Sequence, residues 1–505
     1  MPPTSRRQFL AQSASAALAA AAVSAQRAES QPMTRPNIVF VMADQLRLAS
    51  CGYAGDPLAH TPNIDRLARE SVDFRHCVSS MPVCSAFRAS LFTGKYTTST
   101  GMVINELRMN PNHRCLGHVL TDGGYDTSYI GKWHLWANQL GNHADPKNSF
   151  TPRGPNRLGW DGYWAAFNFR HDYYAPAAYY HTESPEKIVY PAGVYEPDAQ
   201  TDMAIERLKA HKAGNKPFAM VLSYGTPHDP WARGNVPGDG MKRFAEVDFP
   251  LPATYRDEPD TPYGDNWSNE PKTAAKVKEW KRVYYAMTAN LDWNLGRLDA
   301  ALGELGLRDN TILVFTSDHG EMFGAHGRMK KNIFYEEAAR IPFLLRWPAR
   351  AKARVVDTCF SNVDMMPTLL GLAGLPIPAE VEGTDVSHVA LGQPGREPEV
   401  SFLQNTGACA SWEDGHEWRA VRDQRYTYAI YRVDRTELLF DNVADPDQAH
   451  NLAKDAAHAA TLERLRGLLA QQMARVKDTF EASSYYREHW ISPDRRILRT
   501  ATLAG

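Results

Sequence analysis

A lone cysteine lies in the stretch PVCSAFRASLFTG, residues 82–94, four residues before an arginine. Cys84 stands where the pattern begins to read as a helix, and the N–H groups at a helix start favour bound anions. Such a thiol is a buried structural cysteine, a metal ligand, a nucleophile, or a residue that is modified after synthesis. The other chemistry-bearing residues have to decide between these four alternatives.

Polar side chains that can bind metals or move protons follow four short apolar runs, at the point where each run ends. Near-continuous apolar runs are typical of buried parallel strands, and parallel sheets bind ligands at the carboxyl ends of their strands. We therefore expect one shared site at that edge of the sheet. Its members are Asp44 and Gln45 after NIVFVMA, Lys132 and His134 after DTSYIG, His228 after FAMVLSY, and Asp318 and His319 after TILVFTS.

Two carboxylates with an amide oxygen suit a hard divalent cation. Ca²⁺ and Mg²⁺ take oxygen ligands and an added imidazole also tolerates Mn²⁺, whereas a zinc site uses more nitrogen or sulfur. The cation would hold an oxyanion and neutralise charge as it develops. Lys132, His134, His228 and a lysine of GRMKKN, residues 327–332, can surround the remaining oxygens. The set predicts a pocket for sulfate or phosphate esters.

The elements that must position these residues alternate along the chain. A fifth apolar run, FLLRW at 343–347, follows the first four, and helical patterns lie between the runs, the longest from about Thr273 to Leu305. This alternation predicts an α/β fold with a large, mostly parallel central sheet flanked by helices. Residues 417–441 read as further short strands, and a closing helix carries Leu462, Leu465, Leu469 and Met473 on one face.

Composition gives no support for a nucleic-acid partner or for a set of stabilising disulfides. The 505 residues carry a net charge of -2 and no basic block, which gives no support for nucleic-acid binding. The six cysteines form no CxxC motif and no Cys/His zinc spacing. If Cys84 is reserved for chemistry, an odd number is left, so we predict no disulfide framework.

The N-terminus reads as an export address. In SRRQFLAQSASAALAAAAVSA, residues 5–25, the pair Arg6 and Arg7 precedes an Ala-rich stretch that ends in a cleavage site near Ala25, which resembles a twin-arginine signal. The apolar run is too short to span a bilayer. We expect the twin-arginine export machinery as a partner and a periplasmic or secreted protein that is not integral to a membrane.

An ordered set of motifs resembles the formylglycine-dependent sulfatases of the alkaline phosphatase superfamily. The likeness runs from about Pro36 to Ala453 and begins with Cys84-Ser-Ala-Phe-Arg88 followed by ASLFTG. It continues in TPNIDRLARESVDF, GKWH, KPFAMVLSYGTPHDPW, LDWNLGRLDAALGELGLRDNTILVFTSDHGEMFGAHG and YEEAARIPFLL. The resemblance implies an alkaline phosphatase-like fold with a smaller C-terminal antiparallel-sheet domain.

The resemblance also implies why a cysteine stands at position 84. In the family a maturation enzyme oxidises this cysteine to Cα-formylglycine, whose aldehyde hydrates to a geminal diol. One hydroxyl attacks sulfur and the ester alcohol leaves. The other hydroxyl then loses its proton and expels sulfate, a step that a cysteine thiolate could not complete. A formylglycine-generating maturation enzyme is therefore an expected partner.

The family's functional positions map onto this chain residue by residue. The implied metal ligands are Asp44, Gln45, Asp318 and His319, with residue 84 as a further ligand and Ca²⁺ as the preferred metal over Mn²⁺ or Mg²⁺. The implied catalytic group comprises Arg88, which holds the diol; Lys132 and His134, with His134 as the base of the elimination step; and His228 and Lys331, which bind sulfate, with His228 as the acid toward the leaving oxygen. Lys331 is preferred to Lys330 because it stands four residues before YEE.

Two positions depart from the family pattern. Ala86 stands where proline is usual, and Cys-x-Ala-x-Arg is the variant associated with radical-type maturation enzymes. Gln45 stands where many members carry aspartate, which leaves the metal site more positive by one charge. Glutamine at this position also occurs in choline sulfatases and phosphonate monoester hydrolases, so these subgroups stay open.

We predict a sulfuric ester hydrolase that acts on a sulfated carbohydrate. Export favours such a substrate, and GWDGYWAAFNFRHDYYAPAAYYH, residues 159–181, holds nine aromatic residues whose rings suit sugar faces, although loop packing explains them equally. His416 or Trp418 is a candidate for the pocket mouth, with plain scaffold as the alternative. Alternative functions are a phosphonate monoester or phosphodiester hydrolase, a choline sulfatase, and a non-catalytic glycan-binding relative with unmodified Cys84.

These observations divide the chain into four parts. We predict a twin-arginine signal peptide over residues 1–30 and a catalytic domain over residues 35–385. A small C-terminal α+β subdomain over residues 386–480 and a C-terminal tail over residues 481–505 follow.

Overall fold

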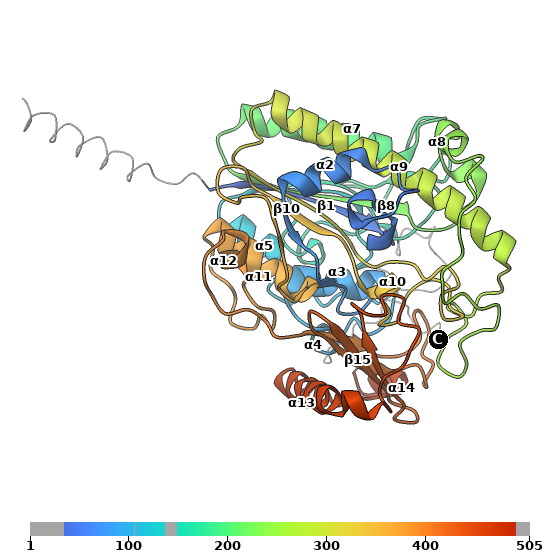
Figure 1. Ribbon diagram of the computed structural model, residues 1–505. Coiled ribbons are helices and arrows are strands. Elements are labelled where there is room, and N and C mark those ends of the chain that lie inside the picture. The colour runs from blue at the N-terminus through green and yellow to red at the C-terminus, as the bar shows by residue number, and fades with distance from the viewer. Residues whose placement is uncertain (1–34, 106, 137–148, 491–505) are drawn as a thin grey trace, which may run out of the picture. The chain divides into compact units, whose positions relative to one another are not determined.

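An eight-stranded sheet forms the centre of the computed structural model, which describes residues 35–105, 107–136 and 149–490. Its strands lie in the order β11-β2-β10-β9-β1-β8-β4-β5, and β10, β1 and β8 are labelled in Figure 1. β10 runs antiparallel to both of its neighbours and every other pair is parallel, which confirms the predicted fold class. The strands are β1 Asn37–Asp44, β2 Val72–Phe74, β4 Asp126–Lys132, β5 Tyr163–Phe167, β8 Phe218–Pro227, β9 Thr311–Ser317, β10 Phe343–Arg346 and β11 Arg354–Val356.

The side chains of β1 alternate between two hydrophobic clusters, because successive residues of a strand point to opposite faces. Val39 and Val41 pack with helices α2, α7 and α9, whereas Phe40 and Met42 pack with α3, α5 and α11. Figure 1 shows these two helical layers on either side of the sheet. Burial on both faces explains the near-continuous apolar runs. The helices are α2 Pro62–Glu70, α7 Glu196–Ala213, α9 Ala274–Glu304, α3 Cys84–Thr93, α5 Leu116–Asp122 and α11 Asn362–Ala373.

Strand register brings the predicted site residues to one edge of the sheet. β1 and β9 are parallel neighbours, and Ala43 pairs with Ser317 at the end of their ladder. Asp44 and Asp318 therefore leave the sheet side by side. On the other side of β1, β8 pairs with β4 up to Ser223 and Gly131, so Lys132 emerges at the same edge.

A second, four-stranded antiparallel sheet follows in the chain. It is built from β13 Ser401–Asn405, β14 Trp418–Arg422, β15 Tyr426–Tyr431 and β16 Glu437–Asp441. Helix α13, Ala459–Arg475, packs on it through Leu462, Leu465 and Leu469. Gln404 N donates to the Ser80 carbonyl at 2.7 Å, which ties this sheet to the segment that leads into α3. Both sheets lie in one compact unit that begins at Asn37, and the boundary at residue 385 stays a prediction.

Short elements complete the described part of the chain. Within it, no helix is both long and apolar enough to cross a membrane. The six cysteines all lie in the described residues, are buried and form no disulfide there. The predicted signal peptide and residues 491–505 of the predicted tail lie outside the described residues, while the start of that tail forms α14, Ser483–Trp490. The short elements are β3 Cys77–Val78, β12 Phe360–Ser361, β6 Tyr179–Tyr180, β7 Ile188–Val189, α4 Thr97–Thr100, α8 Gly238–Arg243, α10 Glu336–Ala339 and α12 Ser387–Ala390.

Candidate active site

Cys84 is the first residue of α3, so its side chain lies at a helix N-terminus. Val83 precedes it as the N-cap residue and makes no side-chain hydrogen bond to the first turn. Every residue of α3 is buried, and Cys84 is 1% exposed. Burial, assisted by the Asp44 carboxylate, raises the pKa of the Cys84 thiol to about 11. The thiol is therefore protonated at neutral pH and is a poor nucleophile as it stands.

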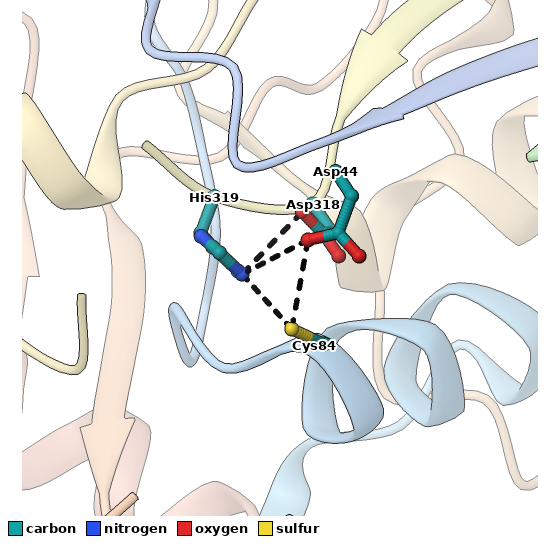
Figure 2. A group of neighbouring side chains, drawn as sticks. All are labelled: Asp44, Cys84, Asp318 and His319. Carbon is teal, nitrogen blue, oxygen red and sulfur yellow. Dashed lines mark hydrogen bonds and ion pairs between the residues drawn. The ribbon is translucent and has the colours of Figure 1, made fainter. Parts of the chain in front are cut away.

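Four side chains converge beside this helix terminus (Figure 2). The candidate ligand atoms of Asp44, Cys84, Asp318 and His319 all lie within 4.8 Å of one another. His319 Nε2 lies 3.2 Å from Cys84 Sγ, 3.5 Å from Asp318 Oδ1 and 3.7 Å from Asp44 Oδ1. His319 Nδ1 lies 3.0 Å from the Gly320 carbonyl, so Nδ1 donates there and Nε2 keeps its lone pair.

The two carboxylates of this cluster are fully buried and affect one another. Burial, and then the neighbouring Asp44 carboxylate, raise the pKa of Asp318 to about 6. Burial also opposes the charged form of Asp44, but the Lys132 ammonium and three further basic side chains hold the pKa of Asp44 well below its ordinary value. Two carboxylates and an imidazole lone pair that face one another fit a hard divalent cation, since the cation would relieve their repulsion.

Gln45 contacts this cluster through its backbone N–H, and its side chain contacts the Lys331 ammonium. Its backbone N–H donates to Asp318 Oδ1 at 3.0 Å, from a left-handed backbone conformation with φ of 69°. Its amide NH₂ donates to Glu321 Oε2 at 2.7 Å, which turns the amide oxygen toward Lys331 Nζ at 2.9 Å. Burial raises the pKa of Glu321 to about 7. Glu321 therefore orients the Gln45 amide. The sequence analysis did not assign Glu321 a role, although it belongs to the motif TSDHGE.

Two buried cations lie on the sheet side of the cluster. Lys132 Nζ forms an ion pair with Asp44 Oδ2. The Arg88 guanidinium lies 3.2 Å from Asp318 Oδ2 and donates to the Lys132 carbonyl and to Ser223 Oγ, each at 2.7 Å. Arg88 is one turn of α3 beyond Cys84, so a single helix presents both residues to the site. Ser223 lies inside a strand, where the sequence pattern offered no sign of a polar role.

Lys331 and His228 lie next to each other on the other side of Cys84. Lys331 Nζ donates to Cys84 Sγ at 3.2 Å and lies 2.8 Å from His228 Nε2. Burial lowers the pKa of His228 well below its ordinary value, and the Lys331 ammonium acts in the same direction. His228 is therefore neutral, with Nδ1 donating to the Asp229 carbonyl and Nε2 accepting from Lys331. Lys330 points elsewhere and pairs with Asp229 Oδ2 at 2.8 Å.

His134 and a histidine that the sequence analysis overlooked complete the site. Both ring nitrogens of His134 are buried and have no hydrogen-bond partner among the described residues. A buried imidazole without partners is costly, so a water molecule or a bound ligand has to supply them. His171 stacks on His228 with ring centroids 3.9 Å apart and planes 5° apart. His171 follows none of the five apolar runs that the sequence analysis identified, so its place could have been found only by treating all histidines between two strands as candidates.

The aromatic segment at 159–181 is mainly part of the core, which corrects its interpretation as a sugar platform. Trp160, Trp164 and Phe167 are 1%, 3% and 1% exposed. In the cluster under α3, Trp164 stacks on Tyr129 and meets Trp133 edge-on, and Trp160 meets Tyr129 edge-on. The alternative that loop packing explains these rings is the one that the structure supports.

The two candidates for the pocket mouth also have scaffold contacts. Trp418 is fully buried, and its Nε1 donates to the Asn332 carbonyl at 3.3 Å. His416 Nδ1 lies 3.1 Å from the Tyr263 carbonyl. Trp418 thus supports the loop that carries Lys331 and does not reach the pocket mouth.

Comparisons with known proteins match almost the whole described chain. The family model described as sulfatase matches residues 36–375, and the one described as N-sulphoglucosamine sulphohydrolase, C-terminal, matches residues 324–475. An ulvan-active sulfatase of Formosa agariphila is 34% identical over 90% of this chain and 84% of its own length. An endo-4-O-sulfatase of Bacteroides thetaiotaomicron is 30% identical over 88% and 92%. A solved structure in complex with its substrate, D-glucosamine-2-N,6-O-disulfate, has a TM-score of 0.74, 25% identity, and coverage of 88% and 99%.

Proposed function

Because the chain belongs to the sulfatase family and is a sulfuric ester hydrolase, we propose that it removes sulfate groups from a sulfated carbohydrate. The observation that carries the proposal is the ring of buried cations around Cys84. Lys331 donates to Cys84 Sγ. Lys132 and Arg88 form ion pairs with the two carboxylates beside Cys84, those of Asp44 and Asp318. A sulfate ester would find donors on each of its free oxygens there. Relatives named for ulvan, for a 4-O-sulfate and for a glucosamine sulfate support a carbohydrate as the ester's alcohol.

We propose further that Cys84 acts after conversion to formylglycine by a maturation enzyme. In this step the Cβ–S bond breaks, the sulfur leaves as sulfide, and Cβ is oxidised by two electrons to an aldehyde, with an oxidant that the enzyme supplies. Formylglycine would supply a hydrated aldehyde, with one hydroxyl for attack on sulfur and one for the release of sulfate. Arg88 is placed to orient that group, since its guanidinium is fixed by Lys132 and Ser223. His134, whose ring nitrogens have no partner among the described residues, can accept the proton that must leave before sulfate is released.

Lys331 and His228 are assigned to the substrate's sulfate and leaving oxygen. Burial opposes the charged form of Lys331, but the acidic groups around it, Cys84 and Asp44 first, raise its pKa, so Lys331 stays charged. In the free enzyme His228 is neutral, and an anionic ester beside it would favour its protonated form. His228 can then protonate the leaving oxygen, with Lys331 beside it neutralising the sulfate.

Asp44, Asp318, His319 and residue 84 would hold a divalent cation, with Gln45 beside them. The cation would supply charge neutralisation at sulfate. We predict one Ca²⁺ per chain, and loss of activity when a chelator removes it, while the far-ultraviolet circular dichroism persists because the core is large. Elemental analysis and restoration of activity by added Ca²⁺ test this. Zinc in the active protein, or activity without any metal, would contradict it.

The place of action is also proposed. A periplasmic or secreted enzyme, sent out by the twin-arginine machinery, would meet sulfated polymers outside the cytoplasm. Fractionation of the native host, with activity assayed in each compartment, tests this proposal. Activity confined to the cytoplasm would refute it.

The reaction class is tested by kinetics on sulfur and phosphorus esters side by side. We expect kcat/KM for 4-nitrophenyl sulfate to exceed that for bis-4-nitrophenyl phosphate and for a phenylphosphonate ester by at least about tenfold, roughly 1.4 kcal/mol of transition-state binding. A preference for either phosphorus ester would favour the phosphonate hydrolase alternative. Screening sulfated oligosaccharides, with choline sulfate as the comparison, then tests the carbohydrate.

A further inference from the structure

A cavity of about 270 Å³ opens beside the catalytic residues and has been given no role so far. It is lined by Asp229, Asn266, Trp267, Glu270 and Lys330. Asp229 Oδ1 lies 3.2 Å from His228 Nδ1, so the carboxylate that lines the cavity also contacts the histidine assigned to the leaving oxygen. The cavity therefore shares a wall with the leaving-group side of the site, where the alcohol part of a sulfate ester must lie.

Trp267 is the apolar surface of this cavity. It is 40% exposed, and it has no ring or cation partner within the part of the chain that the structure describes. The exposed part of the indole is apolar surface that stays in water and is open to a ligand. Its flat, electron-rich face suits the C–H groups on one face of a pyranose ring.

The turn that carries Trp267 is held from both sides. Asp265 accepts from Ser268 N and from Cys409 N, each at 2.7 Å. Met329 N donates to the Ser268 carbonyl at 2.8 Å, which connects the turn to the loop that leads into Lys331. The backbone of this turn is thus fixed before any ligand binds, so a ligand that stacks on Trp267 does not have to order the turn.

The charges around the cavity disfavour a second anionic group. Lys330 Nζ lies 2.8 Å from Asp229 Oδ2 and 3.3 Å from Glu270 Oε2, so one ammonium already serves two carboxylates. A sulfate or carboxylate group here would face Asp229 and Glu270 without a free cation. Hydroxyl groups, in contrast, can donate to Glu270 and can either donate to or accept from the Asn266 amide.

We propose that this cavity is the subsite for the sugar next to the sulfated one, and that this neighbouring ring is uncharged and stacks on Trp267. The proposal rests on the carbohydrate function proposed above and makes it more specific. The substrate class is then an oligosaccharide in which the sulfated ring is linked to a neutral ring, rather than a sulfated monosaccharide or an aryl sulfate.

The test is kinetic and compares Trp267→Ala with Trp267→Phe and with the control Trp293→Ala, which removes a 51% exposed tryptophan of α9. Wild-type enzyme is first screened on sulfated oligosaccharides from ulvan and carrageenan. For a cleaved oligosaccharide with a neutral neighbouring ring, Trp267→Ala should lower kcat/KM about tenfold or more, mainly through KM, and Trp267→Phe should recover part of the loss. The sulfated monosaccharide and 4-nitrophenyl sulfate should change by less than about twofold, as should every substrate with Trp293→Ala.

The outcomes separate this proposal from the one on which it rests. If wild-type enzyme cleaves 4-nitrophenyl sulfate but no sulfated carbohydrate, the carbohydrate function fails and the subsite fails with it. If carbohydrates are cleaved but Trp267→Ala has no effect, or lowers kcat/KM equally for monosaccharide and oligosaccharide, the subsite alone is refuted. A paired substrate whose neighbouring ring is a uronic acid should be at least about tenfold poorer, and the reverse preference would refute the uncharged ring.

Discussion

Replacing Cys84 with alanine is expected to lower kcat for 4-nitrophenyl sulfate by at least about 10⁴-fold, because both covalent steps need a functional group at this position. The remaining cations can still bind the ester, so KM should change far less than kcat. Purified Cys84→Ala protein, assayed beside wild type from the same host, gives the measurement. The control is Cys359→Ala, which removes another buried thiol, one that donates to the Glu399 carbonyl outside the site.

Mass spectrometry separates the proposed mechanism from a simple role of the thiol. The peptide that contains residue 84 should lack the thiol in active wild-type enzyme, and fully active protein with only cysteine there would refute formylglycine. Cys84→Ser should accumulate a sulfated serine, since serine has no second hydroxyl with which to expel sulfate. Cys84→Ala activity within tenfold of wild type would remove residue 84 from the chemistry altogether.

Replacing Asp44 with asparagine is the second change from which we expect a large effect. The Asp44 carboxylate forms ion pairs with Lys132 and Arg88 and is itself one of the candidate metal ligands. Loss of the cation's charge neutralisation should lower kcat/KM by at least about 10³-fold. Elemental analysis of the same sample should show that bound divalent metal is lost in parallel with activity.

Asp44→Asn also leaves buried cations short of an anion, which can cost about 3–5 kcal/mol of folding stability, so thermal unfolding must be recorded for each variant. Asp318→Asn is the second variant, because its ion pair at 3.2 Å is with Arg88 rather than with Lys132. Asp122→Asn, at an exposed carboxylate of α5, is the control and should keep full activity and metal. A folded Asp44→Asn protein that keeps both would refute the assigned metal site.

The central strands were predictable because burial on both faces leaves a mark in the sequence. The runs before Asp44, Lys132, His228 and Asp318 all became strands of the central sheet, and the long helix predicted from Thr273 runs from Ala274 to Glu304. β2 and β11 span three residues each, too few to show a pattern. β5 was hidden in the aromatic segment, whose rings face the core rather than a ligand.

The sequence allowed us to predict the site residues that directly follow strands. It did not allow us to predict the residues that hold those side chains in place. Strand ends pointed to Asp44, Lys132, His228 and Asp318, and register brings them to one edge of the sheet. Glu321, Ser223 and His171 were missed because each acts through another residue's side chain, a relation that exists only after folding. Trp267 was missed because a single tryptophan in an irregular segment has no period and no neighbouring motif.

The complete burial of α3 limits when Cys84 can be modified. An enzyme that modifies Cys84 needs access to the backbone around it, but in the folded protein this segment is helical and covered on all sides. The proposed conversion must therefore happen on the newly made chain, in competition with folding, and the opportunity closes when α3 packs against the sheet and α11. The fraction of active molecules is then fixed by the ratio of two rates. Two preparations with identical folded structures can differ in specific activity solely because their chains folded at different speeds relative to their modification.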